Sequence, residues 1–496
     1  MYEIVIGLEV HAQLKTKTKM FCGSKNNPDE ILPNVNICPV CLGHPGTLPT
    51  INKKAVECVV KVGHALHSEI AKHTKFDRKN YFYPDIPKGY QISQYDMPIC
   101  SGGYLNINSK KINITRIHLE EDTAKSIHGS AGYSLVDFNR ASTPLMELVT
   151  DPDISSGDEA KDFCGELQKI FQYLDISDAN MEKGQMRCEV NISLRKKGTK
   201  EYGTKVEIKN LNSFRAVKDA VDFEEKRQAI LLEKGEKVIQ ETRGWDENKK
   251  ITFSQRLKES AHDYRYFPEP DMPAIELGVR GGIPSINTVD VDALKASLPE
   301  LPREKLERFK SVFGISEKDA NVLIDDKHTS FFFENVVSEL EYLLKEGDDE
   351  VYSDKIKSII QLAVNYMNTD LKKILKEKNI NISDIKMSEE DFSELILMIF
   401  EKKIASSVAK VVLAEMVESG ADPDHIVEER ALSQLNNPDE ISEFAKKVIE
   451  ENKKPVEDYK SGNKNSLQFL LGQVIAKTKG KANPVITKEV LEELLK

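Results

Sequence analysis

Hydrophobic and polar residues alternate at a period of two in four short segments of the chain. In the first segment, "IGLEVHAQL" (residues 6–14), one row of side chains is apolar and the other holds Glu9 and His11. Such alternation is typical of a β-strand that buries one face and leaves the other polar. The pattern recurs in "RIHLEED" (116–122), "RCEVNISL" (187–194) and "TKVEIKNL" (204–211). It therefore predicts four amphipathic strands.

A change of period divides the chain. Up to about residue 290, strand-like runs alternate with turns, and helical segments such as 213–235 are few, which predicts an α+β domain with a largely antiparallel sheet. The proline cluster "SLPELPREK" (297–305) is typical of a linker. Beyond it the periodicity is helical, with a second break at 379–387. We expect an α+β domain at 1–292 and all-helical domains at 293–407 and 408–496.

The composition indicates a globular protein with no membrane-spanning segment. The 496 residues are 40% hydrophobic, which is enough to bury a core in each domain. No run of about 18 apolar residues is present and the N-terminus lacks a basic region, so we expect a cytoplasmic protein without a membrane partner. The net charge of −11 argues against a general nucleic-acid coat but leaves room for a local basic patch.

The polar rows of the four predicted strands are rich in glutamate and histidine. One such row is usually a solvated face, because antiparallel sheets often leave one side in water. Four rows together favour a site for Mg²⁺ or Mn²⁺, which bind carboxylate oxygens and imidazole nitrogens. Basic residues in the neighbouring "FDRKNYFYPD" and "TKVEIKN" would suit phosphate oxygens. The acidic and histidine members of the rows are Glu9, His11, His118, Glu120, Glu189 and Glu207.

The chain lacks the glycine-rich loops of common nucleotide-binding proteins. It has no G-x-x-x-x-G-K-[ST] motif, no G-x-G-x-x-G after a strand and no kinase-type catalytic loop. A carboxylate-lined sheet that holds metal and ATP without such a loop points to the chemistry of glutamine synthetase. In that chemistry a carboxylate accepts the γ-phosphoryl group and ammonia then displaces phosphate.

Eight motifs follow one another along the chain: "GLEVHAQL", "KFDRKNYFYPDIPKGYQISQYDMPI", "RIHLEEDTAKS", "LVDFNRASTPLMELVTDPD", "MRCEVNISLR", "EIKNLNSF", "QETRGWDE" and "DYRYFPEPDMP". Together they closely resemble the B subunits of the tRNA-dependent Asp/Glu amidotransferases, the GatB family. The resemblance implies a cradle-like N-terminal domain related to the catalytic fold of glutamine synthetase. It also implies a helical middle domain and a tail domain that contacts tRNA.

The resemblance implies an ATP- and Mg²⁺-dependent ligase that forms C–N bonds with glutamine as the nitrogen donor. Such an enzyme phosphorylates the side-chain carboxylate of Glu on mischarged tRNA-Gln, or of Asp on mischarged tRNA-Asn, and then amidates it. Ammonia is expected through a channel from an amidase partner, the A subunit, and a small C subunit is expected to tie the A and B subunits together. The chain itself has neither a Ser-Ser-Lys amidase signature nor a Cys-His glutaminase motif.

Individual roles follow from the same resemblance. Glu189 and Glu207 are expected at a second metal position or beside the ammonia nucleophile, although the family usually has Asp in place of Glu189. Phosphate contacts are expected from Lys209 and from Arg78 and Lys79, for which a surface turn is the alternative. The expected metal ligands are Glu9, His11, Glu120 and Glu121.

Three cysteines have the spacing of a zinc ribbon: Cys22, Cys38 and Cys41, the last two in "CPVC". Many members of the resembled family carry C-x-C at the first position, where this chain reads "CGS" and places Ser24. His44 is a possible substitute for the missing ligand. We therefore expect either a structural zinc ion or three unligated thiols.

The tail carries a local excess of positive charge. Between residues 453 and 481 there are seven lysines and two acidic residues, a net of five positive charges (7 − 2). A solvated helix face is the plain interpretation, whereas the resemblance favours contact with tRNA. The expected tRNA contacts are Lys460, Lys464, Lys477, Lys479 and Lys481.

Two other functions stay open from the sequence. A glutamine-synthetase-like ligase that acts on a free carboxylate would leave the lysine-rich tail without a purpose. A non-catalytic tRNA-binding adaptor would leave the acidic rows of the four strands unexplained.

Overall fold

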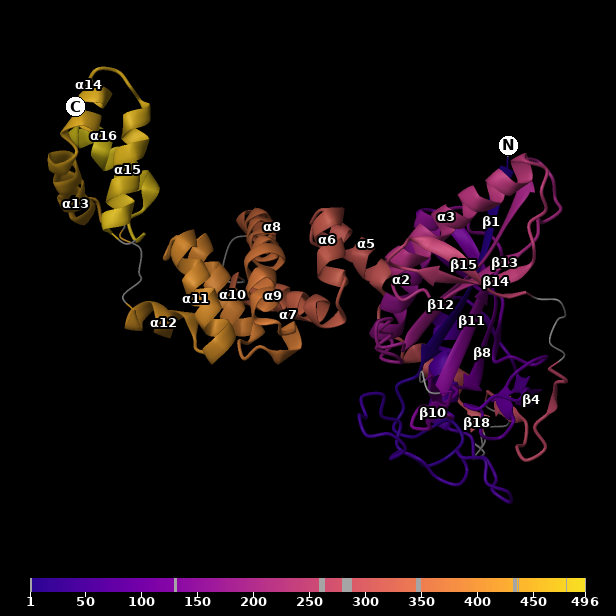
Figure 1. Ribbon diagram of the computed structural model, residues 1–496. Helices are drawn as coiled ribbons and strands as arrows, with labels where there is room; N and C mark the ends of the chain where they lie inside the picture. The colour runs from indigo at the N-terminus through magenta and orange to yellow at the C-terminus, as the bar shows by residue number, and fades with distance from the viewer. Residues whose placement is uncertain are drawn as a thin grey trace. The chain divides into compact units, whose positions relative to one another are not determined.

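The computed structural model describes residues 2–128, 132–257, 264–278, 288–344, 349–430, 435, 437–478 and 480–495. The chain forms two compact units, Met1–Leu301 and Pro302–Lys496, and Figure 1 labels their helices and strands.

A ten-stranded sheet forms the centre of the N-terminal unit. Its ladders between described strands are antiparallel, except that β13 and β14 run parallel. In spatial order the strands are β15 (Ile251–Leu257), β14 (Glu241–Asp246), β13 (Val206–Lys209), β12 (Met186–Lys196), β1 (Tyr2–Gln13), β11 (Pro144–Thr150), β8 (Lys110–Glu121), β6 (Cys100–Ser101) and β2 (Glu69–Ile70), with β7 (Tyr104–Ile107) paired to β8.

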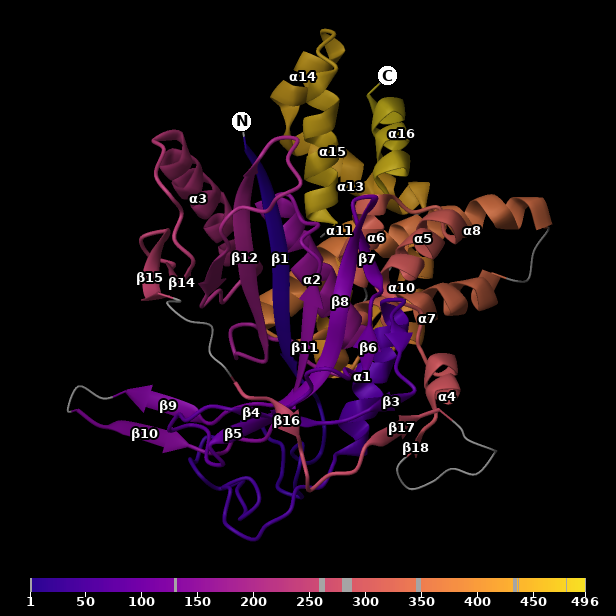
Figure 2. The same ribbon diagram turned by 90° about the vertical axis from the view of Figure 1, so that its right-hand side faces the viewer.

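The N-terminal strand β1 lies in the middle of the sheet, between β12 and β11 (Figure 2). Ile6, Leu8 and Val10 of its apolar row are almost fully buried. Helices pack on this apolar face and share one hydrophobic core with it. They are α1 (Lys53–Ala65), α2 (Gly157–Tyr173) and α3 (Phe214–Glu233), each begun by an Asn or Ser side chain that accepts a hydrogen bond from a backbone N–H. The opposite face carries the polar rows.

Three small sheets and one short helix complete the described part of this unit. One sheet places β4 (Asp77–Asn80) between β16 and β5, and so brings a segment near residue 267 beside the basic stretch at 78–79. The other elements are β5 (Tyr90–Ser93), β16 (Phe267–Pro268), β3 (His73–Thr74), β17 (Ile275–Leu277), β18 (Thr288–Val289), β9 (Lys125–His128), β10 (Ser134–Asp137) and α4 (Val291–Ala296).

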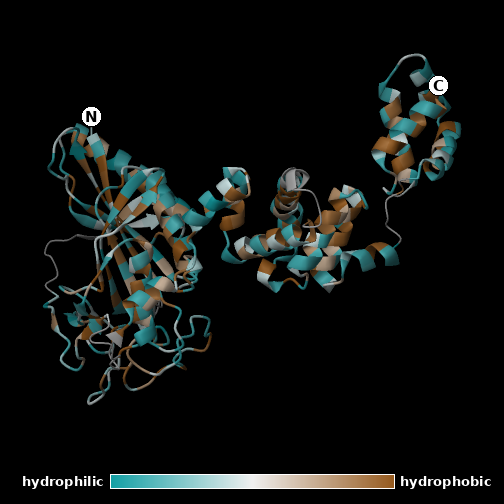
Figure 3. Ribbon diagram, turned by 180° about the vertical axis from the view of Figure 1, so that it is seen from behind, coloured by the Kyte–Doolittle hydropathy of each residue, from teal (hydrophilic) through white to brown (hydrophobic). Residues whose placement is uncertain are grey.

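Helices make up the described secondary structure of the C-terminal unit, apart from one isolated bridge between Leu435 and Ala482. Figure 3 shows its helices banded in hydrophobic and hydrophilic colours, as expected of amphipathic helices. They are α5 (Pro302–Val312), α6 (Glu317–Ile324), α7 (Lys327–Leu344), α8 (Asp349–Tyr366), a π-helical turn (Met367–Leu371), α9 (Lys372–Lys378), a 3₁₀ turn (Ile382–Asp384), α10 (Glu389–Phe400), α11 (Ser406–Ser419), α12 (Pro423–Glu429), α13 (Pro438–Glu451), α14 (Lys453–Lys460), α15 (Asn465–Lys477) and α16 (Pro484–Leu494).

Two separate hydrophobic clusters occur in the helical half. One draws on residues from Phe309 to Val427 and the other on residues from Ile441 to Leu495. Helix α11 contributes Val408 and Val412 to the first cluster, so that core continues past residue 407. The division into three domains at 292 and 407 stays a prediction.

The predicted fold class is confirmed, because a mostly antiparallel N-terminal sheet is followed by a helical C-terminal half. The four amphipathic strands of the sequence pattern are β1, β8, β12 and β13. The likeness of the first domain to glutamine synthetase stays a prediction. Within the described residues, we find no helix with the length and apolarity that a membrane crossing requires.

Candidate metal and phosphate site

Strand register brings two histidines and a glutamate into one line across three neighbouring strands. His11 on β1 is paired with Glu147 on β11, and Glu147 is paired with His118 on β8. Directly paired residues of antiparallel strands project from the same face. The Glu147 carboxylate Oε2 accordingly lies 3.3 Å from His11 Nε2 and 3.5 Å from His118 Nε2. Glu147 is the centre of this group.

Two further carboxylates complete what we call the imidazole–carboxylate cluster. Glu9 and Glu120 each lie 3.7 Å from His11 Nε2. The Ser93 hydroxyl donates to the Glu120 carboxylate at 3.0 Å and so orients it. The cluster therefore consists of Glu9, His11, His118, Glu120 and Glu147.

Burial makes this cluster electrostatically unusual. Burial raises the pKa of Glu9 to about 7, and the charge of Glu147 adds to the shift. Burial by itself would lower the pKa of His11, but its hydrogen bond and charge interaction with Glu147 raise it to about 9. The pKa of Glu147 lies well below its usual range because the charges of His118 and His11 outweigh its burial. The imidazole of His11 is therefore protonated at neutral pH and balances the charge of Glu147.

A second acidic group adjoins the first and shares Glu9 with it. Carboxylate oxygens of Glu9, Glu189 and Glu207 lie within 4.8 Å of one another. The Lys209 ammonium lies 2.7 Å from Glu189 and 3.5 Å from Glu207, and these two charges outweigh burial and raise the pKa of Lys209. We call this the lysine–carboxylate cluster. Strand order explains it, because β1, β12 and β13 are successive strands of the sheet.

Lys79 is the second of the predicted phosphate ligands at this face. Its side chain is largely buried, and the charges of Glu120 and Glu147 outweigh that burial and raise the pKa of Lys79. The ammonium also lies 5.0 Å from the ring centre of Tyr264. A buried ammonium beside the imidazole–carboxylate cluster is suited to hold an anion next to a metal ion.

The structure does not bring Arg78 to this site. Its guanidinium makes a two-pronged pair with Glu269, at 2.7 Å for each bond, and a further contact of 3.1 Å with Asp271. Neighbouring residues of a strand point to opposite sides, and Lys79 is the one that points toward the carboxylates. The Arg78 side chain instead joins β4 to the segment that contains β16.

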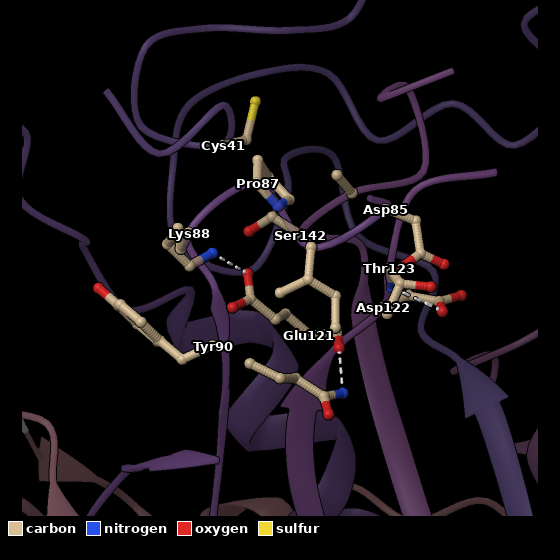
Figure 4. Close-up of a pocket in the computed structure, with 12 residues that line it drawn as sticks. Cys41, Asp85, Pro87, Lys88, Tyr90, Glu121, Asp122, Thr123 and Ser142 are labelled. Carbon is tan, nitrogen blue, oxygen red and sulfur yellow. Dashed lines mark hydrogen bonds and ion pairs between the residues drawn. The ribbon is translucent and has the colours of Figure 1, made fainter. Parts of the chain in front are cut away.

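The structure also separates Glu121 from the other predicted metal ligands. Glu121 follows Glu120 on β8 and lies on the other side of the strand, where its carboxylate contacts Lys88 Nζ at 2.7 Å and accepts a hydrogen bond from the Ile92 N–H at 2.9 Å. Figure 4 shows this ion pair in a small pocket with Tyr90 and Ser142. The cavity there measures about 10 Å³, which is room for one water molecule. Glu121 thus has a partner of its own and does not reach the imidazole–carboxylate cluster.

The three predicted zinc ligands do lie together. The sulfur atoms of Cys22, Cys38 and Cys41 are within 4.8 Å of one another, and Ser24 Oγ lies 4.0 Å from Cys41 Sγ. A hydrogen bond with the Cys22 thiol and the nearby Lys19 ammonium hold the pKa of Cys41 below its usual range. The geometry brings Ser24 to the place where a fourth thiolate is expected.

The tail lysines belong to the helical segment that forms the hydrophobic cluster from Ile441 to Leu495. Lys460 ends α14, Lys464 precedes α15, and both are exposed. Lys477, at the end of α15, forms an ion pair with Glu451. Lys481 is half-buried, and Lys479 lies outside the described residues.

Sequence patterns did not single out Glu147 or Arg187. Glu147 is the one polar residue in "PLMELV", which looks like a fully buried strand, so period-two alternation gave no signal. Arg187 lies on β12 and is paired with His11 on β1. Its guanidinium nitrogen Nη2 lies 2.7 Å from Oδ2 of the buried Asp122. A glutamate alone in an apolar run was the available clue to Glu147, because an isolated buried carboxylate is costly without a partner.

The donor set fits a hard divalent cation. Carboxylate oxygens are the ligands that Mg²⁺ prefers, and imidazole is tolerated by Mn²⁺ and Mg²⁺ sites. Within the imidazole–carboxylate cluster, two groups have ligand atoms within 4.8 Å of one another: Glu9, His11 and Glu147, and His118, Glu120 and Glu147. The imidazole–carboxylate cluster is thus able to hold the metal, with Lys79 beside it for an anion.

Comparison with known proteins shows the family of the chain. Residues 4–280 match the family description "GatB/GatE catalytic domain", and residues 350–495 match "GatB domain". Proteins named as the B subunits of aspartyl/glutamyl-tRNA(Asn/Gln) amidotransferases are similar over the whole chain. Those of Thermoanaerobacter sp. (strain X514) and Persephonella marina are each 46% identical over 499 residues, covering 100% of this chain and 99% and 100% of theirs. That of Gloeothece citriformis is 42% identical and 98% covered. The chain therefore belongs to the family of aspartyl/glutamyl-tRNA(Asn/Gln) amidotransferase B subunits.

Proposed function

We propose that this chain activates the side-chain carboxylate of Glu on mischarged tRNA-Gln, of Asp on mischarged tRNA-Asn, or of both, and then amidates it. The observation that carries the proposal is the imidazole–carboxylate cluster with Lys79 on one side and the lysine–carboxylate cluster on the other. The names of the relatives support the substrate class. The product would be Gln-tRNA-Gln or Asn-tRNA-Asn, and the chain would act as a ligase within a complex.

The first step would be phosphoryl transfer from ATP. A carboxylate oxygen of the substrate attacks the γ-phosphorus, the bond to the β-phosphate oxygen breaks, and ADP leaves as an acyl phosphate forms. Glu147, His11, Glu120 and Glu9 would hold Mg²⁺, which neutralises phosphate charge when bound. Lys79 would hold a phosphate oxygen.

The second step would be attack by ammonia on the acyl carbon. A C–N bond forms, the C–O bond to phosphate breaks with its electron pair going to phosphate, and one proton leaves the nitrogen. The carboxylates of Glu189 and Glu207 are acceptors for N–H groups and would orient the nitrogen. Lys209, now bound to both, would then meet the departing phosphate.

The proposed reaction needs partner proteins, because ammonia must be supplied to this chain. It has no amidase or glutaminase signature, so ammonia is proposed to arrive from an amidase partner, the A subunit, with a small C subunit joining the two. The exposed Lys460 and Lys464 support contact with the phosphates of tRNA. Zinc bound by Cys22, Cys38 and Cys41 is proposed as a structural ion only.

The test is ATP hydrolysis by the purified complex of this chain with its amidase and small partner subunits. We expect mischarged Glu-tRNA-Gln or Asp-tRNA-Asn to stimulate ADP release and to be amidated when glutamine or ammonium is present. Free glutamate or aspartate at the same concentration is expected to do neither. Stimulation by the free amino acid would favour the rival ligase, and tRNA binding without ADP release would favour the adaptor.

A further inference from the structure

The strand β14 carries a polar contact to the site that the mechanism above does not use. Thr242, in the motif "QETRGWDE", is paired with Glu207 across the parallel ladder of β13 and β14. Its hydroxyl donates a hydrogen bond of 2.7 Å to Glu207 Oε2. Both side chains are largely buried, so this bond does not compete freely with water.

This bond orients one oxygen of the Glu207 carboxylate. Lys209 Nζ lies 3.5 Å from the other oxygen, Oε1, which leaves each oxygen with a partner of its own. Lys209 lies closer to Glu189, at 2.7 Å, and is therefore a weak restraint on Glu207. The threonine hydroxyl is the shorter and more directional contact.

The neighbours of Thr242 on β14, Glu241 and Arg243, use their side chains in a separate set of bonds. Arg243 donates to Glu241 Oε1 at 2.5 Å and to Thr252 Oγ1 at 2.8 Å. Thr252 in turn donates to the fully buried Glu224 of α3 at 2.8 Å. These bonds lie on the helix-covered face, whereas Thr242 points to the polar face.

A shift of register reinforces this arrangement. The extra residue lies on β15, because Thr242 is paired with Arg256 and Arg243 with Ser254, which leaves Gln255 between them without a partner in this ladder. Such bulges are frequent beside active sites, where they redirect a side chain. Thr242 keeps a ladder partner on each side, Glu207 on β13 and Arg256 on β15, and these pairings fix its backbone position.

We propose that Thr242 is a positioning residue that holds Glu207 in the direction needed to orient ammonia for the amidation step. This inference rests on the proposed function, since it assigns a partner to Glu207 within that reaction. Thr242 touches neither substrate nor nitrogen and acts through Glu207 alone.

The test compares two hydroxyl-free variants with one that keeps the hydroxyl. Thr242→Val preserves shape and removes the donor, Thr242→Ala is the alternative if the valine variant folds poorly, and Thr242→Ser keeps the donor. Thr252→Val is the matched control, because it removes a threonine-to-glutamate bond of similar length on the opposite face. All are measured in the complex with both partner subunits, with ammonium chloride as the nitrogen source.

Two readings are taken for each variant: the KM for ammonium, and the number of ADP molecules formed per amide bond. We expect Thr242→Val to raise the KM by about tenfold, the cost of one hydrogen bond to a charged group, and to raise the ADP-to-amide ratio. Its rate of ADP formation should stay near that of the parent, and Thr242→Ser should restore both readings. A purely structural role would lower ADP and amide formation together.

The inference is overturned if Thr242→Val and Thr242→Ala keep the parental KM and ratio. It is also overturned if Thr252→Val changes them to the same extent, because the effect would then come from a disturbed sheet edge. Failure of the proposed function looks different, since the unaltered complex would then form no amide on mischarged tRNA.

Discussion

The Glu147 carboxylate lies between two imidazoles, 3.3 Å from His11 Nε2 and 3.5 Å from His118 Nε2. These residues come from three strands, and the register of the sheet alone brings them into line. Glu147 also belongs to both groups of metal donors in the imidazole–carboxylate cluster. Its loss should therefore weaken metal binding more broadly than the loss of any other member.

Replacing Glu147 with glutamine should separate metal binding from folding. Changes in the shell outside a metal site typically cost about 10–100-fold in affinity, so loss of a ligand should cost roughly a hundredfold or more for Mn²⁺. The glutamine is similar in shape and still accepts a hydrogen bond from His11, so the variant should fold, but with a lower unfolding temperature because the His11 imidazole loses its partner charge. His11→Ala should also lose metal and acyl-phosphate formation. Parental Mn²⁺ affinity in Glu147→Gln, measured by paramagnetic resonance, would refute the site.

Replacing Glu121 with glutamine should give the opposite result. Glu121 is paired with the largely buried Lys88, and removing one partner of a buried ion pair leaves the other charge uncompensated. We expect a loss of stability on the order of 3 kcal/mol by denaturant unfolding. Mn²⁺ affinity per folded molecule should match that of the parent. Loss of metal without loss of stability would return Glu121 to the ligand set.

Metal affinity should rise with pH. Glu9, with its pKa raised to about 7, and His11, with its pKa raised to about 9, are both protonated in the metal-free site below about pH 7. A metal ion must displace these protons, so binding should release about two protons below pH 7 and about one between 7 and 9. Mn²⁺ titrations at constant ionic strength from about pH 6 to about pH 9 measure the slope. A flat profile would contradict the assignment of these two ligands.

A fourth thiolate should complete the cysteine cluster. Ser24 Oγ lies 4.0 Å from Cys41 Sγ, and structural zinc normally has four protein ligands. Ser24→Cys should therefore purify with close to one zinc per chain, and the parent with less. Ser24→Ala is the control and should match the parent. A full complement of zinc in both the parent and Ser24→Ala would mean that Ser24 is not the missing ligand.

The tail lysines should affect docking and not chemistry. Each phosphate contact that is lost removes about one unit or less from the slope of log affinity against log salt. Lys460→Ala with Lys464→Ala should lower both tRNA affinity and this slope, while ADP formation at saturating tRNA persists. Lys376→Ala, an exposed lysine of α9, is the control. Unchanged affinity and slope in the double variant would leave these lysines as a solvated helix end.

The family and the fold class could be read from the sequence because both depend on local order along the chain. Period-two alternation placed Glu9, Glu120 and Glu207 on polar strand faces, since the direction of a strand side chain is set by its backbone. The helices of the C-terminal half could also be predicted, from their 3.6-residue period and from end signals such as Gly420. This glycine has the left-handed backbone conformation that ends α11.

The tertiary structure decided which polar residues meet. Glu120 and Glu121 are neighbours in the sequence, yet the strand directs one to the metal donors and the other to Lys88. Arg78 and Lys79 also point to different sites. The carboxylate of Glu269, which lies 191 positions after Arg78 in the sequence, binds the Arg78 guanidinium. Glu147 and Thr242 became visible only through strand register, which depends on pairings between distant segments. A single sequence carries the direction of each side chain along its own strand, but not the strand that will lie beside it.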